Sequence, residues 1–298
     1  MKKTLFLITL ASLPLLFSSC EKAVFDSEDE DVGIVTDVPN GKTKKFTFTV
    51  KGDFSSPVFT RTTDYLSVNN QNMTDLWVFD YVDGVLVQQL HQTPTDETWG
   101  APVLQLTYGQ HHVYFVASRG DVPSVDTANH TITWEGSRDT FWKDYEVSVV
   151  STSNGNRAVT LDRVTTLLRV TVNDEVPEGL ATVTVTPEHW FYGIDYKTGM
   201  AVSDQKRDRT ASIASSYVGT SGQVVISIYG ISNPEEWTTD VSITAKATNG
   251  NTLGSVVIEN APFKRGRATN YSGNLFGSSG SATISLNDEW DDPYNATW

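Results

Sequence analysis

The sequence predicts an all-β protein built from two tandem β-sandwich domains. Segment after segment alternates apolar and polar residues with period two, as in "KKFTFTVKG" and "YEVSVVST", and this alternation is typical of strands that bury one face. Short turn sequences such as Asn154-Gly155 and Asn249-Gly250 separate these segments. No amphipathic segment predicts a helix longer than two or three turns, and many short strands at this spacing are typical of β-sandwiches.

A polar cluster divides the strands into two runs. "STSNGN" ends the first run, and "RAVTLDRVTTLLRVTVND" opens the second. We therefore predict one sandwich at residues 42–156 and another at 157–298, each of the usual size for a domain, about 120 residues. Eight tryptophans and an aromatic share of 11% supply large side chains for two cores.

Residues 1–19 have the layout of a secretory signal peptide. Lys2 and Lys3 precede an apolar run that ends at Phe17 and is too short for a comfortable bilayer span. Cys20 follows, and because it is the only cysteine of the chain, no disulfide within the chain explains it. The ending "FSSC" resembles the lipobox of bacterial lipoproteins, which implies that Cys20 is diacylated, with palmitate for example, and becomes the first mature residue. An ordinary signal peptide with an incidental cysteine is the alternative.

Residues 20–41 are predicted to form an acidic, flexible tether. Positions 26–31 read "DSEDED", and a run so dense in like charges is solvated instead of packed. Acidic residues after the cysteine also resemble the surface-export signals of some gut anaerobes' lipoproteins, although here they begin late. The formal net charge of −14 repels nucleic acid and anionic headgroups, so we exclude both as partners.

We find no catalytic or cofactor motif in the sequence. It contains no Gly-rich phosphate loop, zincin motif or nucleophile elbow, so we predict no enzymatic activity, no cofactor and no metal. His111 and His112 are adjacent in a predicted strand and must point to opposite faces, so one of them at most could join a metal site.

Three segments together resemble the fimbrillin-type fimbrial subunits and fimbrial anchor lipoproteins of gut and oral anaerobes. "MTDLWVFDYVDGVLVQQ" resembles their early hairpin, "VTLDRVTTLLRVTV" the opening of their second domain, and "APFKRGRATNYSGNLFG" the basic segment before their final strands. The matches are loose patterns that cover most of the mature chain. The resemblance implies two transthyretin-like domains, a location at the cell outer membrane, and assembly with other fimbrial subunits for adhesion to host or bacterial surface ligands.

The resemblance also implies a maturation step. In that family an arginine-directed protease often removes the first strand of a shaft precursor, and the empty groove accepts a strand from a neighbouring subunit. Here the matching arginine is Arg61, and the displaced strand is 44–50, which carries Phe46, Phe48 and Val50 on one face. The alternative is that Arg61 is an exposed loop residue that is never cut.

The donor strand predicted from this resemblance is close to the carboxyl terminus. Ala282, Ile284 and Leu286 alternate with polar residues, and "GSSGS" at 277–281 could serve as a hinge. The alternative is that this strand pairs within its own domain.

Two functions follow for testing. The first is a non-enzymatic structural subunit of a cell-surface fimbrium, of shaft, tip or anchor type, assembled by strand exchange and delivered as an outer-membrane lipoprotein. The second is a glycan-binding surface lipoprotein of a polysaccharide uptake system, which predicts an exposed sugar-stacking platform among Trp77, Trp99, Trp134 and Trp142; core tryptophans are the commoner case.

Overall fold

The computed structural model describes residues 41–52, 66–67, 73–120, 123–136, 139–276 and 282–287. Almost every regular element in these residues is a β-strand, and the exception is a single 3₁₀ turn, η2 (Ser215–Tyr217). The predicted all-β class is therefore confirmed. Within the part of the chain that the structure describes, no helix has the length and apolar character needed to cross a bilayer.

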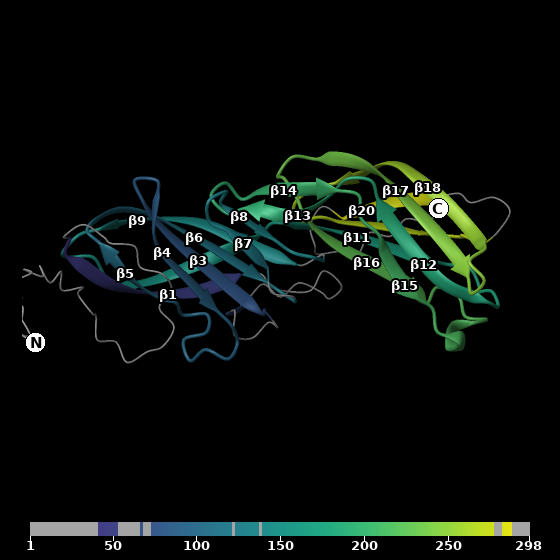
Figure 1. Cartoon of the computed structure of the whole chain (residues 1–298), viewed down its shortest axis with the longest axis horizontal. Helices are drawn as coiled ribbons and strands as arrows, with labels where there is room; N and C mark the ends of the chain where they lie inside the picture. The colour runs from purple at the N-terminus through teal and green to yellow at the C-terminus, as the bar shows by residue number, and fades with distance from the viewer. Residues whose placement is uncertain are drawn as a thin grey trace, which may run out of the picture. The chain divides into compact units, whose positions relative to one another are not determined.

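The first group of strands forms an eight-stranded arrangement in the order β2-β1-β10-β9-β6-β3-β4, with β5 paired to β1. Its strands β1, β3, β4, β5, β6 and β9 are labelled in Figure 1. Its members are β1 (Thr43–Gly52), β2 (Leu66–Ser67), β3 (Asp75–Val82), β4 (Val85–Gln92), β5 (Val103–Thr107), β6 (Gly109–Ser118), β9 (Thr140–Val149) and β10 (Asn156–Arg163). Strand β10 pairs with β1 along most of its length and with β9 only at Asp162 and Arg163, so it bridges two layers. Side chains from β1, β5 and β10 meet those of β3, β6 and β9 in one core, the first core.

The hairpin of β3 and β4 follows from two residues between the strands. Asp83 and Gly84 both have positive φ, 49° and 81°, which is the requirement of a type I′ turn. The dipeptide Asp83-Gly84 therefore forms the two-residue turn between β3 and β4.

The second group contains an eight-stranded sheet and a four-stranded sheet. The larger sheet has the order β20-β19-β11-β16-β13-β8-β7, with β14 paired to β13, and the smaller has the order β15-β12-β17-β18. Apolar side chains of both sheets pack between them as the second core. The strands are β7 (Ser124–Asp126), β8 (Thr131–Thr133), β11 (Thr165–Val172), β12 (Leu180–Pro187), β13 (Trp190–Asp195), β14 (Met200–Gln205), β15 (Arg209–Ser212), β16 (Val224–Ile231), β17 (Trp237–Ala247), β18 (Thr252–Phe263), β19 (Ala268–Gly273) and β20 (Ala282–Asn287).

The membership of the sheets does not follow the predicted boundary between residues 156 and 157. Strand β10 starts at this point and belongs to the first group, because Val159 and Leu161 fill the first core beside β1. In the opposite direction, the hairpin of β7 and β8 lies within the first run of sequence but extends the larger sheet of the second group through β13. The polar cluster at 151–156 is the turn between β9 and β10, and it is not a linker between domains.

Aromatic side chains pack where the two groups of strands meet. The rings of Phe79 and Tyr196 stack with centroids 4.0 Å apart and planes 3° apart, and the hydroxyls of Tyr81 and Tyr196 lie 2.8 Å from each other. Trp142 donates its indole N–H to the carbonyl of Tyr196 at 2.7 Å. Gly199 leaves room for this indole, since an added Cβ would lie 2.8 Å from its ring. No local sequence pattern predicts this aromatic junction.

Candidate functional site: the first and the last strand

The site proposed from the sequence consists of β1 and β20, and β1 has the burial that its sequence predicts. Phe46, Phe48 and Val50 are each 0% exposed, whereas Lys45 and Thr49 on the opposite face are exposed. The alternation of residues in "KKFTFTV" therefore corresponds to one face in the core and one face toward solvent.

Strand β1 is hydrogen-bonded along both edges. On one side it runs parallel to β10, from Thr47 opposite Asn156 to Gly52 opposite Leu161. On the other side it runs antiparallel to β5, and its backbone N–H groups continue to donate past the end of β5, from Phe48 to the carbonyl of Pro102 at 3.0 Å and from Val50 to that of Gly100 at 3.0 Å. A strand held on both edges is an interior strand, and its removal would leave unpaired backbone groups on two neighbours.

The close approach of β10 depends on a glycine. Gly155 accepts a hydrogen bond from the N–H of Thr47 at 2.7 Å, and a Cβ at this position would overlap the carbonyl oxygen of Lys45. Only a residue without a side chain fits here, which gives the Asn154-Gly155 turn a packing role in addition to its role in the chain reversal.

The buried face of β1 packs against the opposite layer of the first core. The ring of Phe48 meets Phe115 edge to face at 5.3 Å and Tyr145 at 5.9 Å, and Phe46 lies under the guanidinium of Arg157 at 5.1 Å. Full burial of one such side chain contributes about 1.5–3 kcal/mol. Without β1, the first core would therefore present an apolar groove to water.

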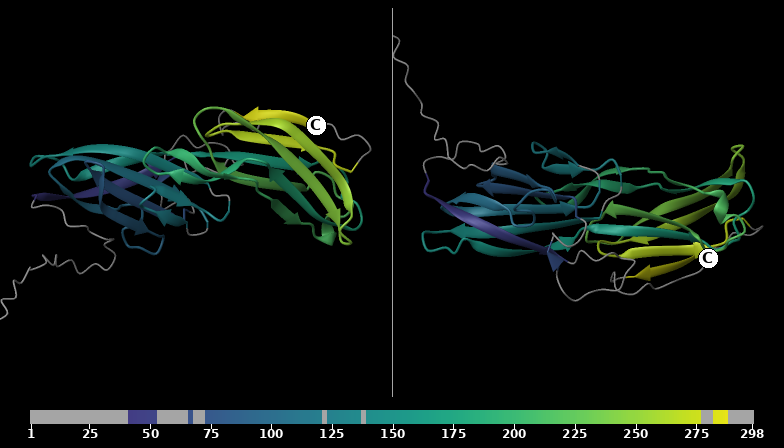
Figure 2. Two further views of the ribbon diagram at one scale, coloured as in Figure 1. Left: turned by 45° about the horizontal axis from the view of Figure 1, so that its top comes forward. Right: turned by 90° about the horizontal axis from the view of Figure 1, so that it is seen from below.

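Strand β20 has a different environment, because it is the last strand of the larger sheet in the second group (Figure 2). Among the strands that the structure describes, it pairs with β19 alone, in antiparallel direction, with Ala282 opposite Gly273, Ile284 opposite Tyr271 and Leu286 opposite Thr269. In this single chain the strand is thus paired within its own sheet, and its role as a donor stays a prediction.

Two of the predicted site residues, Cys20 and Arg61, lie outside the described residues. Lipidation at Cys20 and cleavage after Arg61 therefore remain predictions from the sequence.

The two adjacent histidines point to opposite faces of β6, as predicted. The side chain of His111 is 0% exposed, and that of His112 is 47% exposed. His111 places Nδ1 2.7 Å from Oδ1 of Asp80 and Nε2 2.9 Å from the carbonyl oxygen of Thr107. The hydroxyl of Thr107 also lies 3.2 Å from Nε2, so the surroundings of the ring accommodate a proton on Nδ1 alone or on both nitrogens. The hydrogen bond to Asp80 raises the pKa of His111 against the effect of burial, and burial raises the pKa of Asp80.

His112 belongs to an exposed group of possible metal ligands on β6 and β9. Ligand atoms of His112, Asp144 and Glu146 all lie within 4.8 Å of one another. His112 lies 3.3 Å from Asp144, and this separation is that of an ordinary surface ion pair when the imidazole is protonated. The arrangement alone does not define a metal centre.

The four tryptophans considered for a sugar platform are packed into the protein. Trp99 and Trp134 are buried. Trp77 and Trp142 are half-buried, the first stacked on His91 with centroids 3.9 Å apart and the second bonded to Tyr196. None of the four is exposed, so the prediction of an exposed sugar-stacking platform among these tryptophans is wrong.

The chain belongs to DUF6562, a family of unknown function, whose model matches residues 107–298. No curated protein has a sequence that matches this chain at a significant level.

Several crystal structures share the fold. A candidate adhesin from Bacteroides ovatus aligns with a TM-score of 0.50 at 11% identity, over 86% of this chain and 96% of that chain. A candidate adhesin from Bacteroides thetaiotaomicron gives 0.50 at 11% identity, over 85% and 98%. A candidate polysaccharide-binding protein from the same species gives 0.52 at 8% identity, over 82% and 95%. At these identities the likeness is one of fold, and it extends over nearly the whole of each of those chains.

Proposed function

We propose that this protein is a non-enzymatic structural subunit of a cell-surface fimbrium, of shaft, tip or anchor type, which joins its neighbours by strand exchange. The observation that carries the proposal is the position of β1, the first strand that the structure describes. It is an interior strand with three fully buried side chains, and one cut after Arg61 would separate it from the rest of the chain. The fold shared with candidate adhesins supports a role at the cell surface.

Strand exchange has a clear physical basis at this groove. Loss of β1 would expose apolar side chains of the first core together with the unpaired backbone edges of β5 and β10. A strand from a neighbouring subunit would cover both, because it supplies alternating apolar side chains and a backbone ladder worth about 0.5–1.5 kcal/mol for each hydrogen bond. The donor strand thus replaces β1.

The predicted donor is smaller than the strand it would replace. The apolar side chains of the donor are those of Ala282, Ile284 and Leu286, and they would take the places of Phe46, Phe48 and Val50. Space left in a core costs stability, so a joint between identical chains is weaker than the native attachment of β1. We infer that exchange needs the prior removal of β1, and that β20 does not displace an intact β1.

Delivery as an outer-membrane lipoprotein completes the proposal. Two or three acyl chains on Cys20 would hold the precursor durably at the membrane, and the acidic tether would keep the folded part away from its surface. Cleavage after Arg61 would release lipid and β1 together and yield a shaft or tip subunit. An anchor would keep both.

The amino terminus of the protein recovered from purified surface filaments tests the proposal. A start at Thr62 identifies a shaft subunit, and an acylated Cys20 within the filament identifies an anchor. Arg61→Ala is expected to keep the lipid and to prevent entry into the shaft, whereas Arg209→Ala, at an exposed arginine of β15, is the matched control and should enter normally. A protein that never copurifies with filaments would refute the proposal.

The second candidate function is glycan binding at the cell surface. The fold shared with a candidate polysaccharide-binding protein is compatible with it, but a shared fold does not carry a ligand. A specific feature of this chain is needed, and one cavity provides it.

A further inference from the structure

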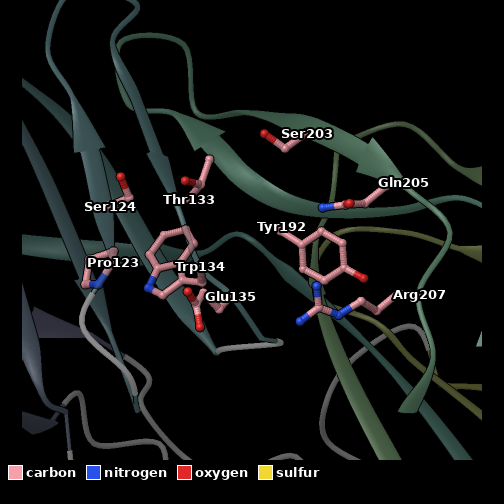
Figure 3. Close-up of a pocket in the computed structure, with 9 residues that line it drawn as sticks. All are labelled: Pro123, Ser124, Thr133, Trp134, Glu135, Tyr192, Ser203, Gln205 and Arg207. Carbon is pink, nitrogen blue, oxygen red and sulfur yellow. The ribbon is translucent and has the colours of Figure 1, made fainter.

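A cavity of about 740 Å³ lies where the hairpin of β7 and β8 meets β13 and β14 (Figure 3). Its volume is within the range of small-molecule sites, about 300–1,000 Å³. The walls come from strands of one continuous sheet, since Gly193 of β13 pairs with Thr133 of β8 on one side and with Val202 of β14 on the other.

Two buried aromatic residues line this cavity, and each carries a polar atom without a partner. Trp134 is 5% exposed and Tyr192 is 2% exposed, and the backbone N–H of Trp134 donates to the carbonyl of Tyr192 at 3.1 Å. Within the described residues, neither the indole N–H of Trp134 nor the hydroxyl of Tyr192 forms a hydrogen bond. Leaving a buried donor unpaired costs about 1–3 kcal/mol, so a ligand that reaches these atoms gains from pairing them.

The hydroxyl of Tyr192 is available as a neutral group. Burial raises the pKa of Tyr192 to about 12, so at neutral pH the hydroxyl both donates and accepts. The guanidinium of Arg207 lies over the same ring, 4.6 Å from its centroid (Figure 3).

The other side chains at the cavity are polar and of mixed charge. Glu135 is exposed and lies beside Trp134 in Figure 3, and Ser203 and Gln205 of β14 are exposed on the opposite side of the view. One cation and one anion thus share the site. A ligand with a net charge of either sign would face one like charge, whereas hydroxyl groups can donate to Glu135 and accept from Arg207 at the same time.

We propose that this cavity binds a neutral saccharide. The rings of Trp134 and Tyr192 supply an apolar wall, and Arg207 and Glu135 supply donors and acceptors for vicinal hydroxyls. The unpaired polar atoms of Trp134 and Tyr192 are closed to water in the free protein, and they pair with the ligand after a small movement of the side chains around them. The proposal rests on the second candidate function, glycan binding, and it is independent of strand exchange, because the described residues that line the cavity include none of β1 or β20.

Calorimetric titration of the mature chain carrying Cys20→Ser, with defined oligosaccharides, tests the site. The neutral probes are maltohexaose, cellohexaose, xylohexaose and mannohexaose, and the charged probes are hexamers of galacturonate and of glucosamine. We expect at least one neutral probe to bind with a submillimolar Kd, and the charged probes to bind more weakly. No binding of any neutral probe at millimolar concentration, or tighter binding of a charged one, overturns the proposal.

Two substitutions locate the binding. Tyr192→Phe removes only the unpaired hydroxyl and keeps the ring, so the fold should persist while affinity falls about tenfold, which corresponds to about 1.4 kcal/mol. Arg207→Gln acts at a half-buried side chain at the edge of the cavity and should weaken binding by a similar factor. Tyr217→Phe, at a tyrosine that is 41% exposed outside the cavity, is the matched control and should bind as the parent does.

The variants also separate this proposal from the fimbrial one. If Tyr192→Phe and Arg207→Gln both bind the probe as tightly as the parent does, the cavity is not the binding site and the inference fails. Entry of Tyr192→Phe into surface filaments should be normal in either case. A loss of sugar binding with normal filaments therefore supports the site without bearing on strand exchange, and a loss of filaments alone bears only on the fimbrial proposal.

Discussion

Strands β1 and β20 are the first and the last strand of the described chain, and they are held in opposite ways. Strand β1 is bonded along both edges and buries three apolar side chains completely, whereas β20 is bonded along one edge at the end of a sheet. Each of the two eight-stranded sheets contains a parallel pair of described strands, β1 with β10 in the first group and β19 with β11 in the second. The difference shows that loss of β1 would open a core and unpair the backbone on both of its sides, whereas loss of β20 would unpair the backbone of β19 on one side.

The largest expected effect on stability comes from removing a buried side chain of β1. In the mature chain carrying Cys20→Ser, Phe48→Ala should lower the free energy of unfolding by about 3–5 kcal/mol, because it removes a ring in contact with Phe115 and leaves a cavity. Urea denaturation measures the change. Thr49→Ala, on the exposed face of the same strand, is the control and should change it by less than about 0.5 kcal/mol. Equal effects of the two substitutions would mean that β1 is not an interior strand in solution.

A second prediction concerns the attachment of β1 to β10. Gly155→Ala should destabilise the chain by about 1–3 kcal/mol, because the new methyl group overlaps the carbonyl oxygen of Lys45 and one strand must move. Amide hydrogen exchange should show faster exchange at Thr47, whose N–H donates to Gly155. The control is Gly84→Asn, at a turn glycine with open space around it and a positive φ that Asn tolerates. If exchange at Thr47 is as slow in Gly155→Ala as in the parent, the predicted clash is absent.

The buried pair His111–Asp80 predicts a pH dependence that belongs to the first core. Since the pKa of His111 is raised above its usual 6.5, the folded chain keeps a proton that the unfolded chain releases. The stabilisation is complete below pH 6.5 and is lost as pH rises through the raised pKa, with a slope of up to about 1.4 kcal/mol per pH unit. Urea midpoints measured from pH 6 to 9 should therefore fall.

His189 is the control for His111, because it also lies beside an aspartate, Asp204, but its side chain is 64% exposed. His111→Gln should remove most of the slope, and His189→Gln should leave it nearly unchanged. A slope that persists in His111→Gln would assign the titration to another group.

The smallest effect is expected at β20. Deletion of residues 282–298 should lower stability by about 1 kcal/mol or less, because an edge ladder of a few hydrogen bonds is largely offset by the ordering of six residues. Circular dichroism and the thermal midpoint measure the change. A large loss of stability on this deletion would mean that β20 covers a core as β1 does, and the contrast between the two strands would disappear.

Local rules predicted the parts of the fold that depend on neighbouring residues. The turn at Asp83-Gly84 needs two residues that tolerate positive φ, and the burial of Phe46, Phe48 and Val50 follows from their alternation with polar residues. Local rules do not account for residues 233–237, "NPEEW", where Pro234 suits the first position of a helical turn but the chain forms a bend that leads into β17. There Trp237 packs on Phe263, with centroids 5.1 Å apart, and this distant contact outweighs the local preference.

The sequence by itself determined the all-β class, the hairpins and the apolar face of β1, because alternation and turn chemistry act over a few residues. Only the tertiary structure decided that β10 joins the first group of strands, that the hairpin of β7 and β8 joins the second, and that Trp134 and Tyr192 line one cavity. Those outcomes depend on which strand edges pair through backbone hydrogen bonds and which rings pack together to exclude water. The partners are far apart along the chain. No local pattern carries that information.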